Sequence, residues 1–332
     1  MPTRMTSWLP AIALGMHMPA AWPAAAQSKD TYPTQSIRLI VPFESGSTAD
    51  TVGRLLAQRL SARLKQEVAI DNRAGEDGAA GTAVAARAKP DGYTATIGSM
   101  TTHVFAPLIR KVTYDPLTDF DPVTAVAIVP YVLALSPVVS AVSLKEFIAH
   151  AKAQPRGVSY SSASDLVGHA AMEMLNNVSG ANVTRVSLHG STSMADPLVT
   201  GKVHALFASL PAVLPYVTSG AVRPVAVSTA DRTAALPDTP TIAESGYPGF
   251  EVVDWFAVFV PRGTPARIIS RLHVATARAS SSSDMESQVA RTGIESRTSI
   301  SNIRVLQRIR ADIKKYSVIV KSIGLEQQSI RP

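Results

Sequence analysis

The sequence predicts an α/β protein of about two domains. Short apolar runs rich in β-branched residues alternate with longer amphipathic segments, an order typical of parallel sheets covered by helices. The chain has 332 residues, about the length of two ordinary domains. Hydrophobic residues make up 46% and charged residues 17%, so we expect a packed core and exclude a disordered chain.

The chain after residue 36 predicts a strand–helix–strand–helix–strand unit. We expect strands over residues 37–41, 68–70 and 93–97 and helices over residues 48–64 and 79–88. In the first helix Val52, Leu56 and Leu60 share one face, whereas Arg59 lies on the opposite face. Because each strand is followed by a helix, the order predicts a parallel, doubly wound sheet.

A second set of units begins near Val126. Its expected strands cover residues 132–135, 158–161, 183–186, 205–208 and 222–227, and its expected helices cover residues 144–152, 169–176 and 194–200. One more strand is expected over residues 258–260, and residues 265–325 read as largely helical. The organisation therefore predicts two α/β domains of similar construction.

The N-terminus has the pattern of a secretory signal peptide. Arg4 precedes an apolar stretch over residues 8–16, and small residues end at Ala26 before polar Gln27. The apolar run is too short to span a membrane and contains Pro10. We expect cleavage near Ala26 and export of the mature chain to the periplasm; a frayed apolar helix is the alternative.

Composition excludes several kinds of chemistry and partner. The chain has no cysteine, which excludes disulfides, zinc ribbons, iron–sulfur clusters and a lipid anchor on cysteine. The formal net charge of +7 is spread along the chain without an aromatic-studded basic patch, so no nucleic-acid partner is expected.

The histidines and serines do not form a recognisable catalytic or metal-binding pattern. No two histidines have the helical spacing of metal ligands, and no serine lies in a Gly-x-Ser-x-Gly turn. The histidines are His17, His103, His150, His169, His189, His204 and His273. We therefore expect no metal, no cofactor and no catalytic residue.

The loop over residues 42–50 is a candidate anion site. It joins the first expected strand to the first expected helix, and it contains Ser45, Gly46, Ser47 and Thr48. Amides at a helix start point outward and the helix dipole favours negative charge there. Ordinary helix capping by Ser47 or Thr48, with Asp50 in the first turn, explains the same residues equally well. The glycine spacing fits neither a Walker loop nor a dinucleotide fingerprint.

Other loops at strand ends are rich in small hydroxyl residues. They cover residues 99–102, 161–164 and 190–193, and such residues suit a carboxylate but are also common in any loop. The acidic loop over residues 71–78 contains Arg73 and lacks the spacing of a calcium-binding loop. We expect it to be a plain strand-to-helix connection.

Many stretches along the chain occur in the order found in one receptor family. They are Tyr32-Pro33, Ile37 to Phe43, Asn72-Arg73-Ala74-Gly75, Pro90-Asp91-Gly92-Tyr93-Thr94, Tyr114-Asp115-Pro116, Asp119-Phe120, Gly201-Lys202-Val203, Leu236-Pro237-Asp238, Pro240 to Glu244, Gly246-Tyr247-Pro248-Gly249, Trp255-Phe256 and Pro261 to Pro265. From about Tyr32 onward the chain therefore resembles the substrate-binding receptors of tripartite tricarboxylate transporters, the Bug or TctC-like receptors.

The resemblance implies a type II periplasmic-binding-protein fold with two α/β lobes that close on a small carboxylate. It places residues 27–127 and 246–332 in the first lobe and residues 128–245 in the second. It implies a monomer that delivers a di- or tricarboxylate, amino acid or aromatic acid to transporter membrane subunits. A sensor receptor that signals to a membrane protein, or an enzyme acting on a small carboxylate, are the alternatives.

Three expected cleft loops depart from the usual family pattern. The first loop reads Ser45-Gly46-Ser47 after Glu44, where proline and two glycines are usual. The loop over residues 161–168 contains Asp165 and is shorter than usual, and residues 186–190 also differ. Since Glu44 and Asp165 are acidic, we hypothesise an altered ligand, such as an aminated or aromatic carboxylate. An orphan receptor whose cleft loops have drifted explains the departures equally well.

The loops and the resemblance together give the residues that we expect to contact the ligand. They are Phe43, Ser45, Gly46, Ser47, Thr48, Asp50, Ser99, Met100, Thr101, Ser162, Ala163, Ser164, His169, His189, Gly190, Ser209 and Trp255.

Overall fold

The computed structural model describes residues 32–155, 157–162, 166–186, 195–297 and 301–325, together with Met1. The chain divides into a unit that ends at Tyr32 and a unit from Pro33 to Pro332, and the account below concerns the second. Apart from Met1, the expected signal peptide over residues 1–26 lies outside the described residues.

Strands and helices alternate along the second unit. Its first part contains β1 (Ile37–Val41), α1 (Thr48–Leu64), β2 (Val68–Asn72), η1 (Glu76–Gly78), α2 (Ala79–Ala86), β3 (Thr94–Ser99), η2 (Thr101–Phe105) and α3 (Ala106–Ile109). Its middle part contains β4 (Phe120–Leu135), α4 (Leu144–Ala153), β5 (Val158–Ser161), α5 (Leu166–Ser179), β6 (Val183–Arg185), α6 (Asp196–Val199), β7 (Ala205–Ser209), α7 (Leu210–Thr218) and β8 (Arg223–Val227). Its last part contains β9 (Val253–Pro261), α8 (Ala266–Ser280), α9 (Ser283–Ala290), β10 (Glu295–Ser296) and α10 (Asn302–Ser322).

Sequence reasoning found most of these elements; those it missed include α3, β10 and two longer features that contain proline. β1, α1 and β5 have the predicted bounds, but α7 and the first part of β4 were not expected. Pro211 stands in the first turn of α7, where its missing N–H has no intrahelical partner. β4 shifts register between Pro122 and Thr124, so its ladder accommodates the missing donor.

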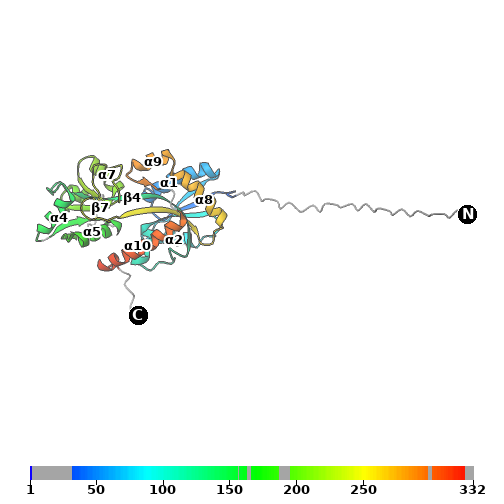
Figure 1. The fold of residues 1–332 in the computed structure, drawn as a ribbon, viewed down its shortest axis with the longest axis horizontal. Helices are drawn as coiled ribbons and strands as arrows, with labels where there is room; N and C mark the ends of the chain where they lie inside the picture. The colour runs from blue at the N-terminus through cyan, green and yellow to red at the C-terminus, as the bar shows by residue number, and fades with distance from the viewer. Residues whose placement is uncertain (2–31, 156, 163–165, 187–194, 298–300, 326–332) are drawn as a thin grey trace, which may run out of the picture. The chain divides into compact units, whose positions relative to one another are not determined.

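The strands form two sheets that share β4. In the first sheet β1 pairs parallel with β2 and β3, and β9 pairs antiparallel with β3 and β4. In the second sheet β5 pairs parallel with β6 and β7, while β4 pairs antiparallel with β7 and β8. Figure 1 shows α4, α5 and α7 around one end of β4 and α1, α2 and α8 around the other. The predicted two-lobed α/β fold is confirmed.

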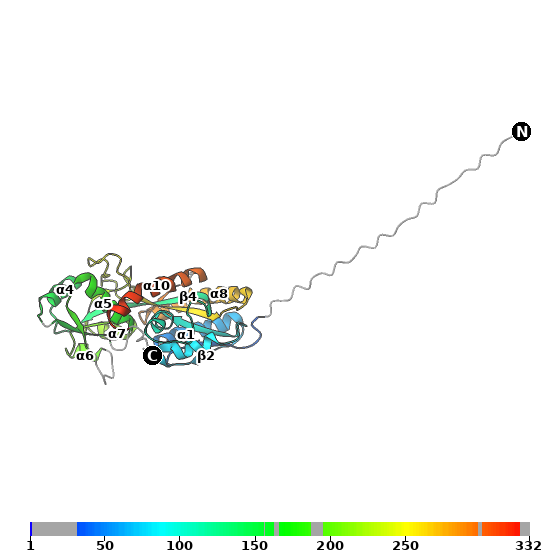
Figure 2. The same cartoon turned by 90° about the horizontal axis from the view of Figure 1, so that it is seen from below.

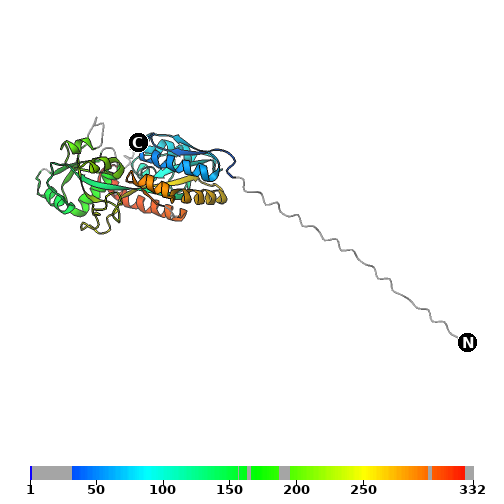
Figure 3. The same ribbon diagram turned by 90° about the horizontal axis from the view of Figure 1, so that it is seen from above.

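Helices from the end of the chain cover the first lobe and reach the second. α8 packs beside α1 and against β4 (Figure 3). α10 contacts β4, η2 and α3, and extends to α5 of the second lobe (Figure 2). The lobe boundaries at residues 127 and 246 stay a prediction. Within the described residues, no helix has both the length and the apolarity needed to cross a bilayer.

The core explains why α1 takes its place on the first sheet. Val52, Leu56 and Leu60 are buried, as their shared helical face predicts. Gly53 brings α1 against the sheet, because a Cβ there would lie 2.9 Å from a methyl group of Val41. This packing fixes the N-terminal end of α1, which follows the carboxyl end of β1.

Candidate functional site

A pocket of about 370 Å³ lies where the two sheets meet. Its lining comes from the loop after β1 and the start of α1, from η2, from the crossing strands β4 and β9, and from the end of β7. The residues are Phe43, Ser47, Thr48, Ala49, Thr101, Val129, Tyr131, Ser209, Asp254 and Phe256. A pocket of this size suits a small molecule.

The first turn of α1 brings main-chain donors to this pocket. Ser47 is the N-cap, and its Oγ accepts the Asp50 amide at 3.2 Å. The Thr51 amide makes the first bond along the helix, to the Ser47 carbonyl at 2.9 Å. The amides of Thr48 and Ala49 lie in the first turn, where no carbonyl four residues earlier is in helical position. Both residues line the pocket, so the positive dipole end of α1 lies beside it.

Asp50 organises the loop from behind the pocket. Its carboxylate accepts the Gly46 amide at 2.9 Å, Arg54 Nε at 2.8 Å and Asn72 Nδ2 at 2.9 Å. Burial by itself raises the pKa of Asp50, but the bonds from Arg54, Gly46 and Asn72 outweigh burial and hold that pKa below its usual value. Because the Gly46 amide donates to Asp50, it is used within the loop. Ser45 is exposed, and neither it nor Gly46 nor Asp50 lines the pocket.

The loop after β3 also uses its amides internally. The Ser99 amide donates to Thr102 Oγ1 at 2.9 Å, and the Met100 amide donates to Asp254 Oδ1 at 2.9 Å. Met100 is fully buried, and of the predicted residues in this loop only Thr101 lines the pocket. The carboxylate to which the Met100 amide donates therefore belongs to β9 of the protein itself.

The crossing strands supply pocket residues that sequence reasoning missed. Val129 of β4 stands opposite Asp254 of β9, and Tyr131 of β4 stands opposite Ser209 of β7. Asp254 Oδ1 also accepts the Trp255 amide at 2.8 Å. The available signal was a single acidic residue inside an otherwise apolar strand. The missed residues are Ala49, Val129, Tyr131, Asp254 and Phe256.

Trp255 lies beside the pocket and faces away from its lining. Its side chain is buried, and Nε1 donates to Asp312 Oδ2 of α10 at 2.9 Å. Arg308 Nε donates to the same oxygen at 2.8 Å. The bond between Trp255 and Asp312 therefore ties a crossing strand to the C-terminal helix.

Outside the crossing strands, one described residue of the second lobe lines the pocket, namely Ser209. Ser209 precedes α7, and its side chain does not cap that helix. Ser162 is fully buried and its Oγ has no hydrogen-bond partner among the described residues. His169 is buried beside Glu173 of the same helix, and burial, followed by the charge of Arg185, lowers the pKa of His169 to about 4. Four further predicted residues lie outside the described part of the chain, namely Ala163, Ser164, His189 and Gly190.

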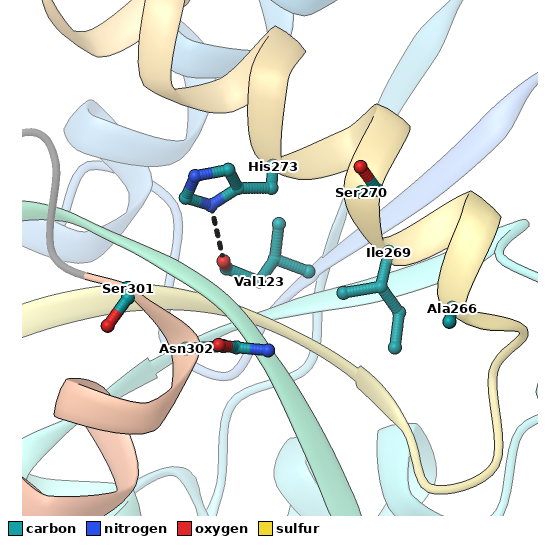
Figure 4. Close-up of a pocket in the computed structure, with 7 residues that line it drawn as sticks. All are labelled: Val123, Ala266, Ile269, Ser270, His273, Ser301 and Asn302. Carbon is teal, nitrogen blue, oxygen red and sulfur yellow. Dashed lines mark hydrogen bonds between the residues drawn. The ribbon is translucent and has the colours of Figure 1, made fainter.

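A second pocket of about 280 Å³ lies away from the crossing between the sheets. Figure 4 shows it between α8 and the start of α10, with His273 donating from Nδ1 to the Val123 carbonyl at 2.9 Å. None of the predicted ligand-binding residues lines it. Among the described residues, no cluster of three or more metal-ligating side chains occurs. The pocket between the sheets is therefore the candidate site.

Comparison with known proteins agrees with this architecture. Residues 52–325 match the family described as "Tripartite tricarboxylate transporter family receptor". Protein BugT of Bordetella pertussis is 37% identical over 78% of this chain and 81% of its own length.

Two solved structures share both the fold and part of the sequence. An R. palustris protein solved with adipate is 36% identical, with a TM-score of 0.77 over 89% of this chain and 99% of that one. MatC from Rhodopseudomonas palustris, with bound malate, is 28% identical, with a TM-score of 0.72 over 87% and 100%. On the family match and the identity to BugT, this chain belongs to the receptor family of the tripartite tricarboxylate transporters.

Proposed function

We propose that this protein captures a small organic carboxylate between its two lobes and delivers it to a tripartite transporter. One observation carries the proposal. The first turn of α1 in the first lobe and Ser209, the residue before α7 in the second lobe, line the same pocket. Helix N-termini attract negative charge, so an anion in this pocket would interact favourably with both lobes and would stabilise their closure.

In the proposed complex the amides of Thr48 and Ala49 donate to one carboxylate. The hydroxyls of Thr101 and Ser209 complete its hydrogen bonds from the two lobes. None of the ten described residues that line the pocket is lysine, arginine or histidine, so closure buries no cationic side chain there. Neutral donors bind the ligand without an ion pair that would have to be broken on release, which suits a receptor that delivers its ligand.

The relatives support this class of ligand and this role. One solved relative contains adipate and another contains malate, both carboxylates. The solved relatives include a periplasmic binding protein, and the matched family is one of transport receptors rather than enzymes. We place the mature chain in the periplasm, after removal of residues 1–26.

A ligand screen tests the proposal. The purified protein would be heated with dicarboxylates, tricarboxylates, amino acids and aromatic acids. A ligand present at 100 times its dissociation constant adds about 2.7 kcal/mol to the free energy of unfolding, which raises the melting temperature by several degrees. A screen in which no carboxylate raises the melting temperature would refute the proposed function.

A pair of substitutions at Thr48 tests the role of the main chain. Thr48→Pro removes the amide at the first helical position, where proline is well tolerated. Ser47 already has the extended backbone that a following proline requires, with φ −68° and ψ 165°. Thr48→Ala is the matched control, because it removes the hydroxyl and keeps the amide. We expect at least tenfold weaker binding in the proline variant only. Equal ligand affinities in the two variants would show that the Thr48 amide does not bind the ligand.

A further inference from the structure

The C-terminal helix α10 carries most of the net charge of the protein. Its 21 residues include six that are lysine or arginine and one that is acidic, a net +5 out of +7 for the whole chain. Sequence reasoning treated the basic excess as spread along the chain, and this clustering corrects that view. A helix with so unequal a charge is a candidate interaction surface.

The positive charges of α10 gather on the side of the helix that points away from the protein. Val305, Ile309 and Tyr316 are buried and mark the side that packs against the fold. Because an α-helix turns once every 3.6 residues, the exposed basic residues fall on the outward side. They form the basic face of α10 and are Arg304, Arg310, Lys314 and Lys321.

The acidic residue of α10 does not offset this face. Asp312 is buried, and its Oδ2 accepts Arg308 Nε at 2.8 Å and Trp255 Nε1 at 2.9 Å. Lys315 Nζ donates to the Glu251 carbonyl at 2.6 Å, so contacts on the inner side hold the helix in place. Among the described residues, the side chains of the basic face make no hydrogen bond or ion pair. The four charges are therefore available to a partner on a preformed surface.

Two large aliphatic side chains are exposed among these charges. Ile303 is 65% exposed and Val318 is 67% exposed. Val318 is four residues after Lys314, and residues at that spacing are neighbours on a helix. Basic and aliphatic groups together suit the headgroup layer of a bilayer, where cations meet lipid phosphates and aliphatic groups reach the acyl boundary. This mixture favours a lipid surface over a purely acidic protein surface.

We propose that the basic face of α10 binds the anionic headgroups of a phospholipid bilayer and holds the protein at the membrane surface. The inference goes beyond the proposed function and does not depend on which ligand the pocket takes. The helix lies on the bilayer, because its buried side remains packed against the protein. A receptor held at the surface stays close to a membrane transporter, which raises its effective concentration there.

Co-sedimentation with vesicles tests the inference. Sucrose-loaded vesicles of phosphatidylcholine alone would be compared with vesicles of phosphatidylcholine and phosphatidylglycerol in equal parts. The protein would be the mature chain, because an apolar signal peptide would itself bind lipid. We expect at least tenfold stronger binding to the anionic vesicles at about 0.1 M salt. Most of that difference should be lost at about 1 M salt, where the screening length falls from about 10 Å to about 3 Å.

A variant with four substitutions assigns the binding to α10. It carries Arg304→Gln, Arg310→Gln, Lys314→Gln and Lys321→Gln, and glutamine keeps a high helix propensity. The matched control loses the same charge at four exposed lysines outside α10. Its changes are Lys89→Gln, Lys145→Gln, Lys152→Gln and Lys202→Gln. We expect at least tenfold weaker binding to anionic vesicles in the α10 variant and a change below threefold in the control.

The outcomes decide the inference separately from the proposed function. Equal binding to the two kinds of vesicle, or binding to neither, overturns the proposal and leaves the basic face to an acidic protein surface. A control that loses as much binding as the α10 variant overturns the assignment to α10. Circular dichroism checks the fold of both variants. Should the α10 variant fail to fold, Arg310→Gln with Lys314→Gln replaces it, with at least threefold weaker binding expected. A failed carboxylate screen leaves this inference standing, since vesicle binding needs no ligand.

Discussion

Substitution of Asp50 by alanine is expected to destabilise the loop that shapes the pocket. The Asp50 side chain is 3% exposed, and it accepts the Gly46 amide at 2.9 Å and Asn72 Nδ2 at 2.9 Å. Hydrogen bonds to a charged group are worth about 1.5–3 kcal/mol each, and the partners that remain lose their acceptor. Because part of the loop relaxes toward water, we expect a loss of about 2–3 kcal/mol in the free energy of unfolding. Urea unfolding followed by circular dichroism at pH 7 measures it.

Asp71→Ala is the control for this experiment. Asp71 also pairs with two arginines, Arg38 and Arg73, but its side chain is 24% exposed. Partly exposed pairs contribute little, so we expect a loss below about 1 kcal/mol. If Asp50→Ala loses no more stability than Asp71→Ala, the argument for a buried organising carboxylate is refuted.

The stability difference between wild type and Asp50→Ala should also depend on pH. Since the pKa of Asp50 is lower in the folded state, its contribution is present above the unfolded pKa of about 4 and is lost as pH falls through the folded pKa. The difference between wild type and Asp50→Ala should therefore shrink in acid. A difference that stays constant down to pH 2 would contradict the assigned ionisation.

Three further predictions concern other parts of the fold. Burial, followed by Arg185, lowers the pKa of His169 to about 4, so the unfolded state alone binds a proton between pH 6.5 and 4. Stability should fall as pH drops through that window, by about 3 kcal/mol at most from this residue, and His169→Asn should flatten the slope in urea titrations. Asp312→Leu leaves Trp255 Nε1 buried without its acceptor, and we expect a loss of about 2–3 kcal/mol in the same assay. Gly98→Ala would place Cβ 2.5 Å from ring atoms of two neighbours, which should lower the melting temperature by overpacking worth about 1–3 kcal/mol. An unchanged unfolding midpoint in either variant would contradict the corresponding contact.

Local signals predicted the first-lobe elements well. The bounds of α1 follow from an apolar face that repeats every three or four residues and from Ser47, which caps the helix. Both signals depend on residues that are close in the sequence. The same reasoning failed for α7, because Pro211 and Pro215 read as breakers while packing of Leu210 and Val213 in the second lobe holds the helix.

The candidate site was predicted in part. Phe43, Ser47, Thr48, Thr101 and Ser209 line the pocket, as expected for residues at the carboxyl ends of strands. Their contact with a ligand stays a prediction. The pocket residues of β4 and β9 were not expected, because a strand pattern does not show which strands cross between lobes. Only the antiparallel pairing of these two long strands places Val129 directly opposite Asp254.

The sequence by itself determined the two-lobed α/β class, the family and the loop after β1 as a candidate part of the site. These depend on periodicity, capping and motifs, which act over a few residues. Only the tertiary structure decided which donors are available. The Gly46 amide is taken by Asp50, and the Met100 amide is taken by Asp254, a residue far away along the chain. An amide that already donates to a carboxylate of the protein is not available to a ligand. That hydrogen bond forms only when folding brings the strands together.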